Sequence, residues 1–101
     1  MINGLGGVDT VRGLGGNDVL CGGTGNDTIQ SGPDNDRAFG ELGNDVVRGG
    51  GGPDLVSGGD GADRLFGDEA NDELTGGTGR DRCDGGTGMD TQTGCEVRTN
   101  I

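Results

Sequence analysis

The chain has 101 residues, 27 of them glycine, and its 18 acidic residues against seven basic ones give a formal net charge of −11. Because there is no lysine or histidine, and no apolar run approaches the ~20 residues of a membrane helix, we expect neither a nucleic-acid partner nor membrane insertion. Apolar residues make up only 27% of the chain. Ordering one residue costs roughly 1.5 kcal/mol, so composition alone would indicate disorder.

A strict internal repeat argues against disorder. Nine-residue units follow one another from Gly4 to Thr93 without an insertion or deletion, which makes ten units. The first residue of a unit is glycine except at Ser31, and the fourth is glycine except at Asp34 and Ala70. The sixth residue is always aspartate, at Asp9, Asp18, Asp27, Asp36, Asp45, Asp54, Asp63, Asp72, Asp81 and Asp90. This regularity predicts an architecture in which each unit stacks on its copies.

The last three residues of a unit form a short predicted strand with one inward side chain, at the eighth position. All but the last of these inward residues suit an apolar interior: they are Val11, Leu20, Ile29, Ala38, Val47, Val56, Leu65, Leu74, Cys83 and Gln92. A three-residue strand is too short to be stable alone, so it has to pair with the copies above and below it. Since the first six residues of a unit read as a glycine-rich turn, two units make one coil. We therefore predict an all-β solenoid with two parallel strands per coil and about five coils.

In such a coil, odd-numbered units stack along one edge and even-numbered units along the other. The odd edge then carries Asp9, Asp27, Asp45, Asp63 and Asp81, and the even edge carries Asp18, Asp36, Asp54, Asp72 and Asp90. Carboxylates about 5 Å apart repel each other by roughly 3 kcal/mol at an effective dielectric constant near 20. A divalent cation between successive coils would reverse the sign of this interaction. Carboxylate and carbonyl oxygens without histidine favour Ca²⁺ over a transition metal.

The units resemble the RTX (repeats-in-toxin), or hemolysin-type, calcium-binding nonapeptide repeats, which have the form Gly-Gly-x-Gly-x-Asp-x-apolar-x. The resemblance implies a right-handed parallel β-roll in a secreted, extracellular protein. It also implies Ca²⁺ ions between units i and i+2, up to about eight in all. The implied ligands are the ten sixth-position aspartates and the backbone carbonyls of Gly4, Gly22, Gly25, Gly40, Gly43, Gly58, Gly61, Gly76 and Gly79.

The two edges differ at the fourth position of the unit. Odd units always have glycine there, whereas the even units are interrupted at Ser31-Gly-Pro-Asp34 and at Gly67-Asp-Glu-Ala70. A Cβ atom at positive φ costs about 1 kcal/mol or more. We therefore expect a complete calcium row on the odd edge and a weaker or gapped row on the even edge. Near the interruptions, Asp34, Asp68 and Glu69 either supply replacement oxygens or belong to the solvated surface.

At the C-terminal end, Gln92 indicates that the core closes in the last unit. Cys83 takes the inward position one unit earlier and Cys95 follows in the tail. A disulfide between them would close a loop of about 13 residues and stabilise the fold by roughly 3 kcal/mol. The pair also resembles the Cys-x-Gly-Gly…Cys-Glu ending of secreted bacterial calcium-binding repeat proteins. Cys21, at an outward ninth position, is left over, and we expect a single domain over residues 1–101 with a tail or cap from residue 94.

The first coil has no evident cap and is expected to present open strand edges. Either a neighbouring part of a larger protein covers them or copies of the chain stack end to end. The leading hypothesis is a calcium-binding structural module that folds into a rigid β-roll when it binds extracellular calcium. The alternative is a calcium-dependent filament, or an adhesin or spacer segment, that assembles through the uncapped coils. Equivalent aspartates offer neither the unlike environments nor the cleft of a carboxylate hydrolase, so we expect no enzyme and no catalytic residue.

Overall fold

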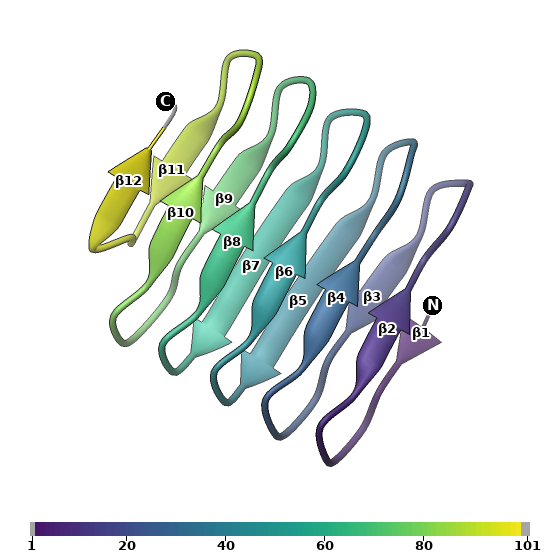
Figure 1. Ribbon diagram of the computed structural model, residues 1–101, viewed down its shortest axis with the longest axis vertical. Helices are drawn as coiled ribbons and strands as arrows, with labels where there is room; N and C mark the ends of the chain where they lie inside the picture. Colours follow the sequence, from purple (N-terminus) through teal and green to yellow (C-terminus); the bar gives the residue numbers. More distant parts are fainter. Residues whose placement is uncertain (1, 100–101) are drawn as a thin grey trace.

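The structure, a computed structural model, describes residues 2–99, so Met1 and the end of the expected tail, Asn100 and Ile101, lie outside it. Within that range the chain forms twelve strands and no helix, and the strands alternate between two parallel six-stranded sheets (Figure 1). Sheet A contains, in order, β1 (Ile2–Asn3), β3 (Val19–Cys21), β5 (Arg37–Leu42), β7 (Leu55–Asp60), β9 (Glu73–Thr75) and β11 (Thr91–Thr93). Sheet B contains β2 (Thr10–Arg12), β4 (Thr28–Gln30), β6 (Val46–Arg48), β8 (Arg64–Phe66), β10 (Arg82–Asp84) and β12 (Val97–Thr99).

Strands of the repeats pair with the copy two units further along. Leu20 pairs with Ala38 in sheet A, and Val11 pairs with Ile29 in sheet B. One coil therefore consists of two repeat units, crosses each sheet once and returns one strand further along (Figure 1). The predicted parallel β-roll, with two units per coil and about five coils, is confirmed.

The core is a single layer of side chains between the two sheets. Its members come from the eighth position, as predicted, and all are at most 6% exposed: Val11, Leu20, Ile29, Ala38, Val47, Val56, Leu65, Leu74, Cys83 and Gln92. The Cα trace measures 33 × 30 × 13 Å, and the short dimension fits two sheets separated by one layer of side chains. One inward residue from each repeat strand leaves little apolar area to offset the ordering of the glycine-rich turns.

The C-terminal tail forms part of the solenoid. Arg82 pairs with Arg64 of the preceding coil and with Val97 of the tail. Fewer residues separate Arg82 from Val97 than from Arg64, so β12 extends sheet B after a shortened turn. The sequence predicted a tail or cap here but not a strand, because the tail departs from the period of the repeats. The predicted disulfide between Cys83 and Cys95 is present, and Cys95 packs into the hydrophobic core.

Two further details differ from the sequence expectations. β5 and β7 have six residues, because their pairing continues past the glycine of the next turn, with Glu41 opposite Gly59. Cys21 lies at an outward position but is only 7% exposed, since Asn3 and Phe39 flank it in register on the neighbouring strands. Burial, followed by the charge of Glu41, raises the pKa of this free thiol.

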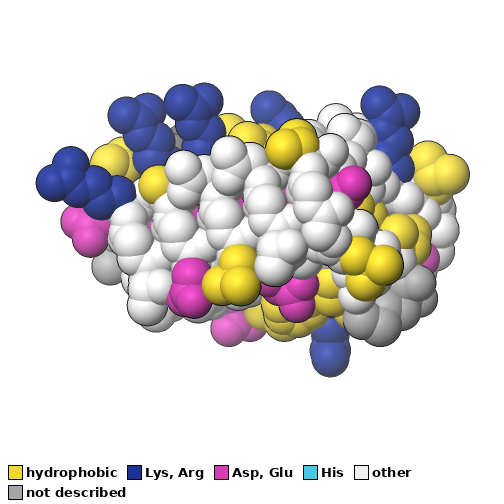
Figure 2. Space-filling model, turned by 90° about the horizontal axis from the view of Figure 1, so that it is seen from below, with side chains coloured by type: hydrophobic (Ala, Val, Ile, Leu, Met, Phe, Trp, Pro, Cys, Tyr) yellow, Lys and Arg dark blue, Asp and Glu magenta, His cyan; other side chains and the backbone are white. Residues whose placement is uncertain are grey.

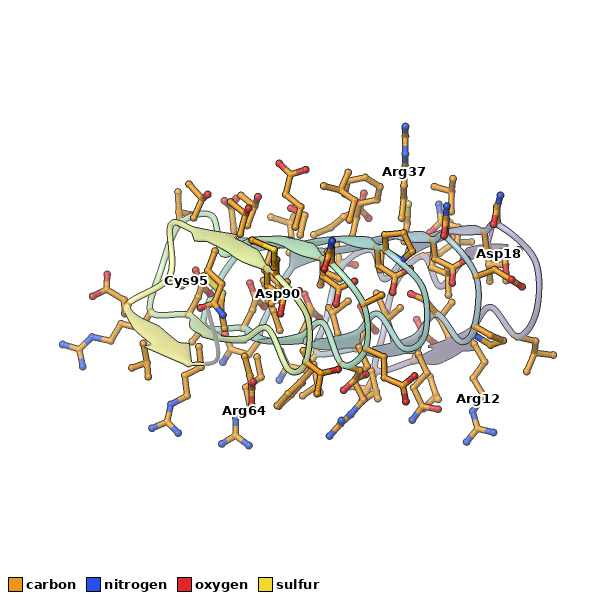
Figure 3. The ribbon with its side chains drawn as sticks, turned by 90° about the horizontal axis from the view of Figure 1, so that it is seen from above. Arg12, Asp18, Arg37, Arg64, Asp90 and Cys95 are labelled. Carbon is orange, nitrogen blue, oxygen red and sulfur yellow. A yellow bond between two sulfur atoms is a disulfide. The ribbon has the colours of Figure 1, made fainter. Side chains whose placement is uncertain are left out.

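The turns form the two edges of the roll. Figure 2 looks onto the edge formed by the odd-numbered turns, where the white surface of backbone and uncharged polar side chains dominates and basic side chains project along the margins. Figure 3 looks onto the even edge, with Arg37 pointing out of one sheet and Arg12 and Arg64 out of the other. Seven of the ten sixth-position aspartate side chains are buried beneath the edges of the roll.

Candidate metal centre

The sixth-position aspartates lie where each turn enters the next strand, and the stacking of coils brings them into two ladders. From Asp27 onward, each carboxylate is bonded to the coil before it, because its Oδ1 accepts the backbone N–H of the corresponding aspartate in that coil. Eight such bonds have N···Oδ1 distances of 2.7–2.8 Å, among them Asp45 N–H to Asp63 Oδ1. In Figure 3, Asp18 and Asp90 mark the two ends of the even ladder.

The second oxygen of each carboxylate has no such bond. In the described part of the chain, Oδ2 of all ten sixth-position aspartates is inaccessible to solvent and has no hydrogen-bond partner. Seven of these side chains are at most 4% exposed: Asp27, Asp36, Asp45, Asp54, Asp63, Asp72 and Asp81. A buried carboxylate oxygen without a donor or a cation costs several kcal/mol, so ten of them indicate sites for a ligand of positive charge.

Burial sets the ionisation of the central carboxyls. Removal from water, above all, raises the pKa of Asp54, Asp63 and Asp72 to about 7 and that of Asp45 to about 6. The pKa of Asp36 and Asp81 is raised for the same principal reason. The backbone N–H bond to each carboxylate opposes this shift, and the neighbouring carboxylates add to it. A bound divalent cation would favour the ionised forms instead.

Beside first-position glycines lies a space flanked by two oxygen atoms from different coils, which we call the inter-coil gap. A Cβ atom on Gly58 would lie 2.5 Å from Asp63 Oδ2 and 2.8 Å from the carbonyl oxygen of Gly76. On the even edge, a Cβ on Gly49 would lie 2.7 Å from Asp54 Oδ2 and 3.1 Å from the carbonyl oxygen of Gly67. The same pair of oxygens flanks Gly4, Gly22, Gly40 and Gly67. A side chain at the first position would fill this gap, which accounts for glycine there in nine of the ten units.

The carbonyls predicted as ligands do not all lie in the same place. Those of Gly22, Gly40, Gly58 and Gly76 face the inter-coil gap of the preceding coil, whereas Gly4 has no preceding coil to face. The fourth-position carbonyls of Gly25, Gly43 and Gly61 point toward the fourth-position glycine of the next coil. A Cβ atom on that next glycine would contact the carbonyl oxygen. For Gly79 the structure places the glycine against Gly61 but shows no contact of its own carbonyl.

Side chains alone do not form a cage. Among the described residues, no three histidine, cysteine, aspartate or glutamate side chains cluster closely enough to hold a metal ion. A cation in the inter-coil gap therefore needs backbone carbonyls in addition to the carboxylates. Such an all-oxygen set suits Ca²⁺, which takes six to eight oxygen ligands in flexible geometry. The residues present thus fit the ion that the sequence predicted.

Ser31 begins the interruption that the sequence predicts for the even edge, but the effect of its side chain at the first position was not predicted. It stands first in unit four, so its Cβ occupies the position that is empty beside a first-position glycine. Its side chain is fully buried and its Oγ has no hydrogen-bond partner among the described residues. The signal was visible in the sequence, because Ser31 is the one first-position residue other than glycine, and it falls on the edge predicted to be gapped.

The even edge also carries more backbone strain. Asp34 and Ala70, which replace fourth-position glycines, adopt φ values of 80° and 71°, close to the glycine conformation they replace. Leu14 and Asp68 on the even edge, and Leu5 and Glu41 on the odd edge, adopt positive φ at the second position. The carboxylates of Asp34 and Asp68 accept the backbone N–H groups of Gly16 and Gly50, at 2.8 and 3.2 Å. These bonds join neighbouring coils through both side chains. Glu69, the third acid near the interruptions, is exposed to solvent.

The fold and the two carboxylate ladders define a class: a parallel β-solenoid whose repeats place oxygen ligands between coils. The particular family follows from comparison with known families. The family described as RTX calcium-binding nonapeptide repeat (4 copies) matches residues 1–29, 22–56 and 57–91. The chain belongs to this family and is a structural calcium-binding module. No curated protein and no solved structure gives a significant match.

Across residues 2–99, no helix is long and apolar enough to cross a membrane.

Proposed function

We propose that this module folds into its rigid β-roll only when it binds calcium, and that it acts outside the cell, where calcium is millimolar. The observation that carries the proposal is the set of ten buried Oδ2 atoms that have no hydrogen-bond partner in the described structure. RTX repeats are typical of secreted bacterial proteins, which supports an extracellular setting.

The proposed ligands are the Oδ2 atoms of the two ladders together with backbone carbonyls between coils. On the odd edge these are Asp9, Asp27, Asp45, Asp63 and Asp81 with the glycine carbonyls predicted from the repeat. On the even edge they are Asp18, Asp36, Asp54, Asp72 and Asp90, with a break where Ser31 fills the gap. Up to about eight ions fit four intervals on each edge, and the odd row is the more complete.

The energetic argument is one of linkage. Closing the roll buries the carboxylates and brings them close together. Burial and mutual repulsion both make these carboxylates harder to ionise. An ion that binds only the folded state stabilises it by about 2.7 kcal/mol per site at a concentration 100 times the dissociation constant. Several such sites supply the stability that a core with one inward residue per strand lacks, so calcium concentration controls folding.

A second function, end-to-end assembly, is favoured by the N-terminal end of the roll. β1 and β2 are the edge strands of the two sheets there, and no strand of the described chain pairs with their outer side. Leu5, Val8 and Leu14 in the first two turns are 68%, 83% and 69% exposed. In this alternative a second copy covers that end and extends both sheets. Particle size by light scattering with calcium present should then grow with protein concentration, whereas a monomeric module keeps a constant size.

The principal test is far-ultraviolet circular dichroism of the oxidised chain during a calcium titration, with magnesium as the control. We expect a coil spectrum in chelator, a cooperative transition to β structure with calcium, and little change with magnesium at the same concentration. Magnesium is the appropriate control because it demands near-ideal octahedral geometry and keeps its water ligands. A full β spectrum in chelator would refute coupled folding, because it would show that the core and the disulfide suffice.

A further inference from the structure

The last odd-numbered turn meets the C-terminal tail instead of another repeat, and the tail reproduces the repeat's oxygen positions. A Cβ atom on Gly76 would lie 2.8 Å from Asp81 Oδ2 and would contact the carbonyl oxygen of Gly94. Gly94 follows Gly76 at the same distance along the chain as Gly76 follows Gly58. Its carbonyl therefore occupies the place that a first-position glycine takes in each earlier coil, although Gly94 lies outside the ten units.

The tail also places an acidic residue at the backbone level where the next aspartate of the ladder would stand. Arg82 pairs with Val97, so the residue before each, Asp81 and Glu96, share a level in the stack. The N–H groups of Glu96 and Val97 both donate to the carbonyl oxygen of Asp81, at 3.0 and 3.1 Å. In the repeats, the same carbonyl receives the N–H of the residue that follows the next aspartate, as Asp63 does from Arg82 at 2.9 Å. Glu96 thus stands in the aspartate position of a shortened turn.

The disulfide holds this arrangement together. Cys95 lies between Gly94 and Glu96, and it is bonded to Cys83, two residues after Asp81. Both sulfur-bearing side chains are buried, at 1% and 9% exposure. The bond therefore fixes the Gly94 carbonyl and the Glu96 backbone against the turn that carries Asp81.

The carboxylate at the centre of this arrangement is short of a partner. Asp81 is 0% exposed, its Oδ1 accepts the N–H of Asp63 at 2.8 Å, and its Oδ2 has no hydrogen-bond partner among the described residues. Burial raises the pKa of Asp81, and the charge of Glu96 adds to that shift. Glu96 itself is exposed, so its carboxylate has the freedom to turn toward a ligand.

We propose that the tail builds a further calcium site, beyond the intervals between repeats, from Asp81 Oδ2, the Gly94 carbonyl oxygen and the Glu96 carboxylate. This inference rests on the proposed function, because it extends the same chemistry by one interval on the odd edge. The consequence is that the disulfide-closed cap is itself a calcium-binding element. Three of its features, Gly94, Cys95 and Glu96, then serve one site, which the nine-residue pattern does not reveal.

The test counts bound ions by native mass spectrometry and calorimetry in three oxidised chains: the unaltered chain, Glu96→Gln and the control Glu73→Gln. Glu73 is an exposed acid on β9, so its substitution removes the same charge away from the tail. We expect Glu96→Gln to bind one ion fewer, or to bind one ion at least tenfold more weakly, and Glu73→Gln to match the unaltered chain. Equal counts and affinities for Glu96→Gln and Glu73→Gln would overturn the proposal.

A crystal structure grown with calcium separates this proposal from the general function. An ion beside Gly76, within about 2.3–2.6 Å of Asp81 Oδ2 and the Gly94 carbonyl oxygen, would support it. Ions beside Gly22, Gly40 and Gly58 with none beside Gly76 would refute the tail site and uphold the proposed function. Absence of ions from every inter-coil gap at saturating calcium would refute both.

Discussion

The odd and even edges of the roll have the same backbone but different sequences. Fourth-position residues on the odd edge are all glycine, with φ values of 99° at Gly25 and 100° at Gly79. On the even edge, Asp34 and Ala70 are held at φ values of 80° and 71°. Each Oδ2 atom of both ladders is buried in the same way. Stacking on neighbouring copies therefore fixes the turn conformation. A residue other than glycine at the fourth position keeps the positive φ and is strained, because the turn does not change its geometry.

The even edge therefore looks complete, although we expect it to bind calcium less well. Its inter-coil gaps beside Gly49 and Gly67 have the same two oxygens as those of the odd edge. Its deficits are energetic at Asp34 and Ala70, where the left-handed conformation costs about 1–2 kcal/mol per residue, and steric at Ser31. Substitutions at the gaps and relief of strain test this difference between the edges, and a change of pH tests what the two edges share.

The largest effect is expected from filling an inter-coil gap. Gly58→Ala on the odd edge places a methyl group 2.5 Å from Asp63 Oδ2, and Gly49→Ala on the even edge places one 2.7 Å from Asp54 Oδ2. We expect Gly58→Ala to lower the free energy of unfolding in saturating calcium by about 2–3 kcal/mol, and Gly49→Ala by roughly 1–2 kcal/mol, through overpacking and loss of an ion. Urea unfolding and ion counting measure both.

Gly51→Ala is the matched control for this pair. Gly51 does not adopt positive φ, and the nearest atom to its added Cβ is the Cα of Pro33 at 3.8 Å. Its substitution should leave stability unchanged or raise it by up to about 1 kcal/mol, because alanine restricts the unfolded chain. Equal stabilities for Gly58→Ala and Gly51→Ala would show that the gap beside Gly58 is not a ligand site.

The next effect concerns pH and should be the same on both edges. The pKa is raised to about 7 for Asp63 on the odd edge and for Asp54 and Asp72 on the even edge. A raised pKa means that the ion-free roll binds more protons than the unfolded chain between about pH 4 and 7. Its stability is therefore fully present below about pH 4 and is lost as pH rises through 7. In chelator, acidification from pH 8 to pH 5 should increase β structure in the circular dichroism spectrum.

Calcium binding should respond to pH in the opposite direction, because its carboxylate ligands have to be ionised. If one proton leaves per ion, the calcium midpoint rises about tenfold per pH unit below 7. High salt is the control, since it screens the general repulsion of a chain with charge −11 but acts weakly on buried carboxyls. No gain of β structure in chelator on acidification to pH 5, at either salt concentration, would contradict the raised pKa values.

The sequence predicted the fold because the repeat leaves few alternatives. One inward residue in each unit, as at Leu20 and Ile29, fixes the strands, and a period shared by all ten units fixes their register at two units per coil. The two aspartate ladders follow from that register alone. The disulfide was also predicted, since Cys83 occupies an inward position and only one cysteine lies in the tail.

Features that depend on contact between coils were not predictable from one unit. The role of first-position glycine depends on the next coil, because Gly58 lies between Asp63 of its own unit and the carbonyl of Gly76 in the coil that follows. The shortened turn before β12 was missed because the period ends before it, and the burial of Cys21 depends on Asn3 and Phe39 from neighbouring coils. These features depend on which residues of neighbouring coils come into contact, and the sequence of one repeat unit does not show that.

The smallest expected effect addresses the strain itself. Ala70→Gly on the even edge relieves a left-handed alanine, whereas Ala62→Gly on the odd edge makes the same chemical change at an exposed residue without positive φ. We expect Ala70→Gly to raise the free energy of unfolding in saturating calcium by roughly 0.5–1 kcal/mol, because relief of strain exceeds the added entropy of the unfolded chain. Ala62→Gly should lower it by about 0.4–1 kcal/mol. Urea unfolding of the two variants measures both signs. If both variants were destabilised equally, strain at Ala70 would not distinguish the edges, and the weaker row would have to be attributed to Ser31 alone.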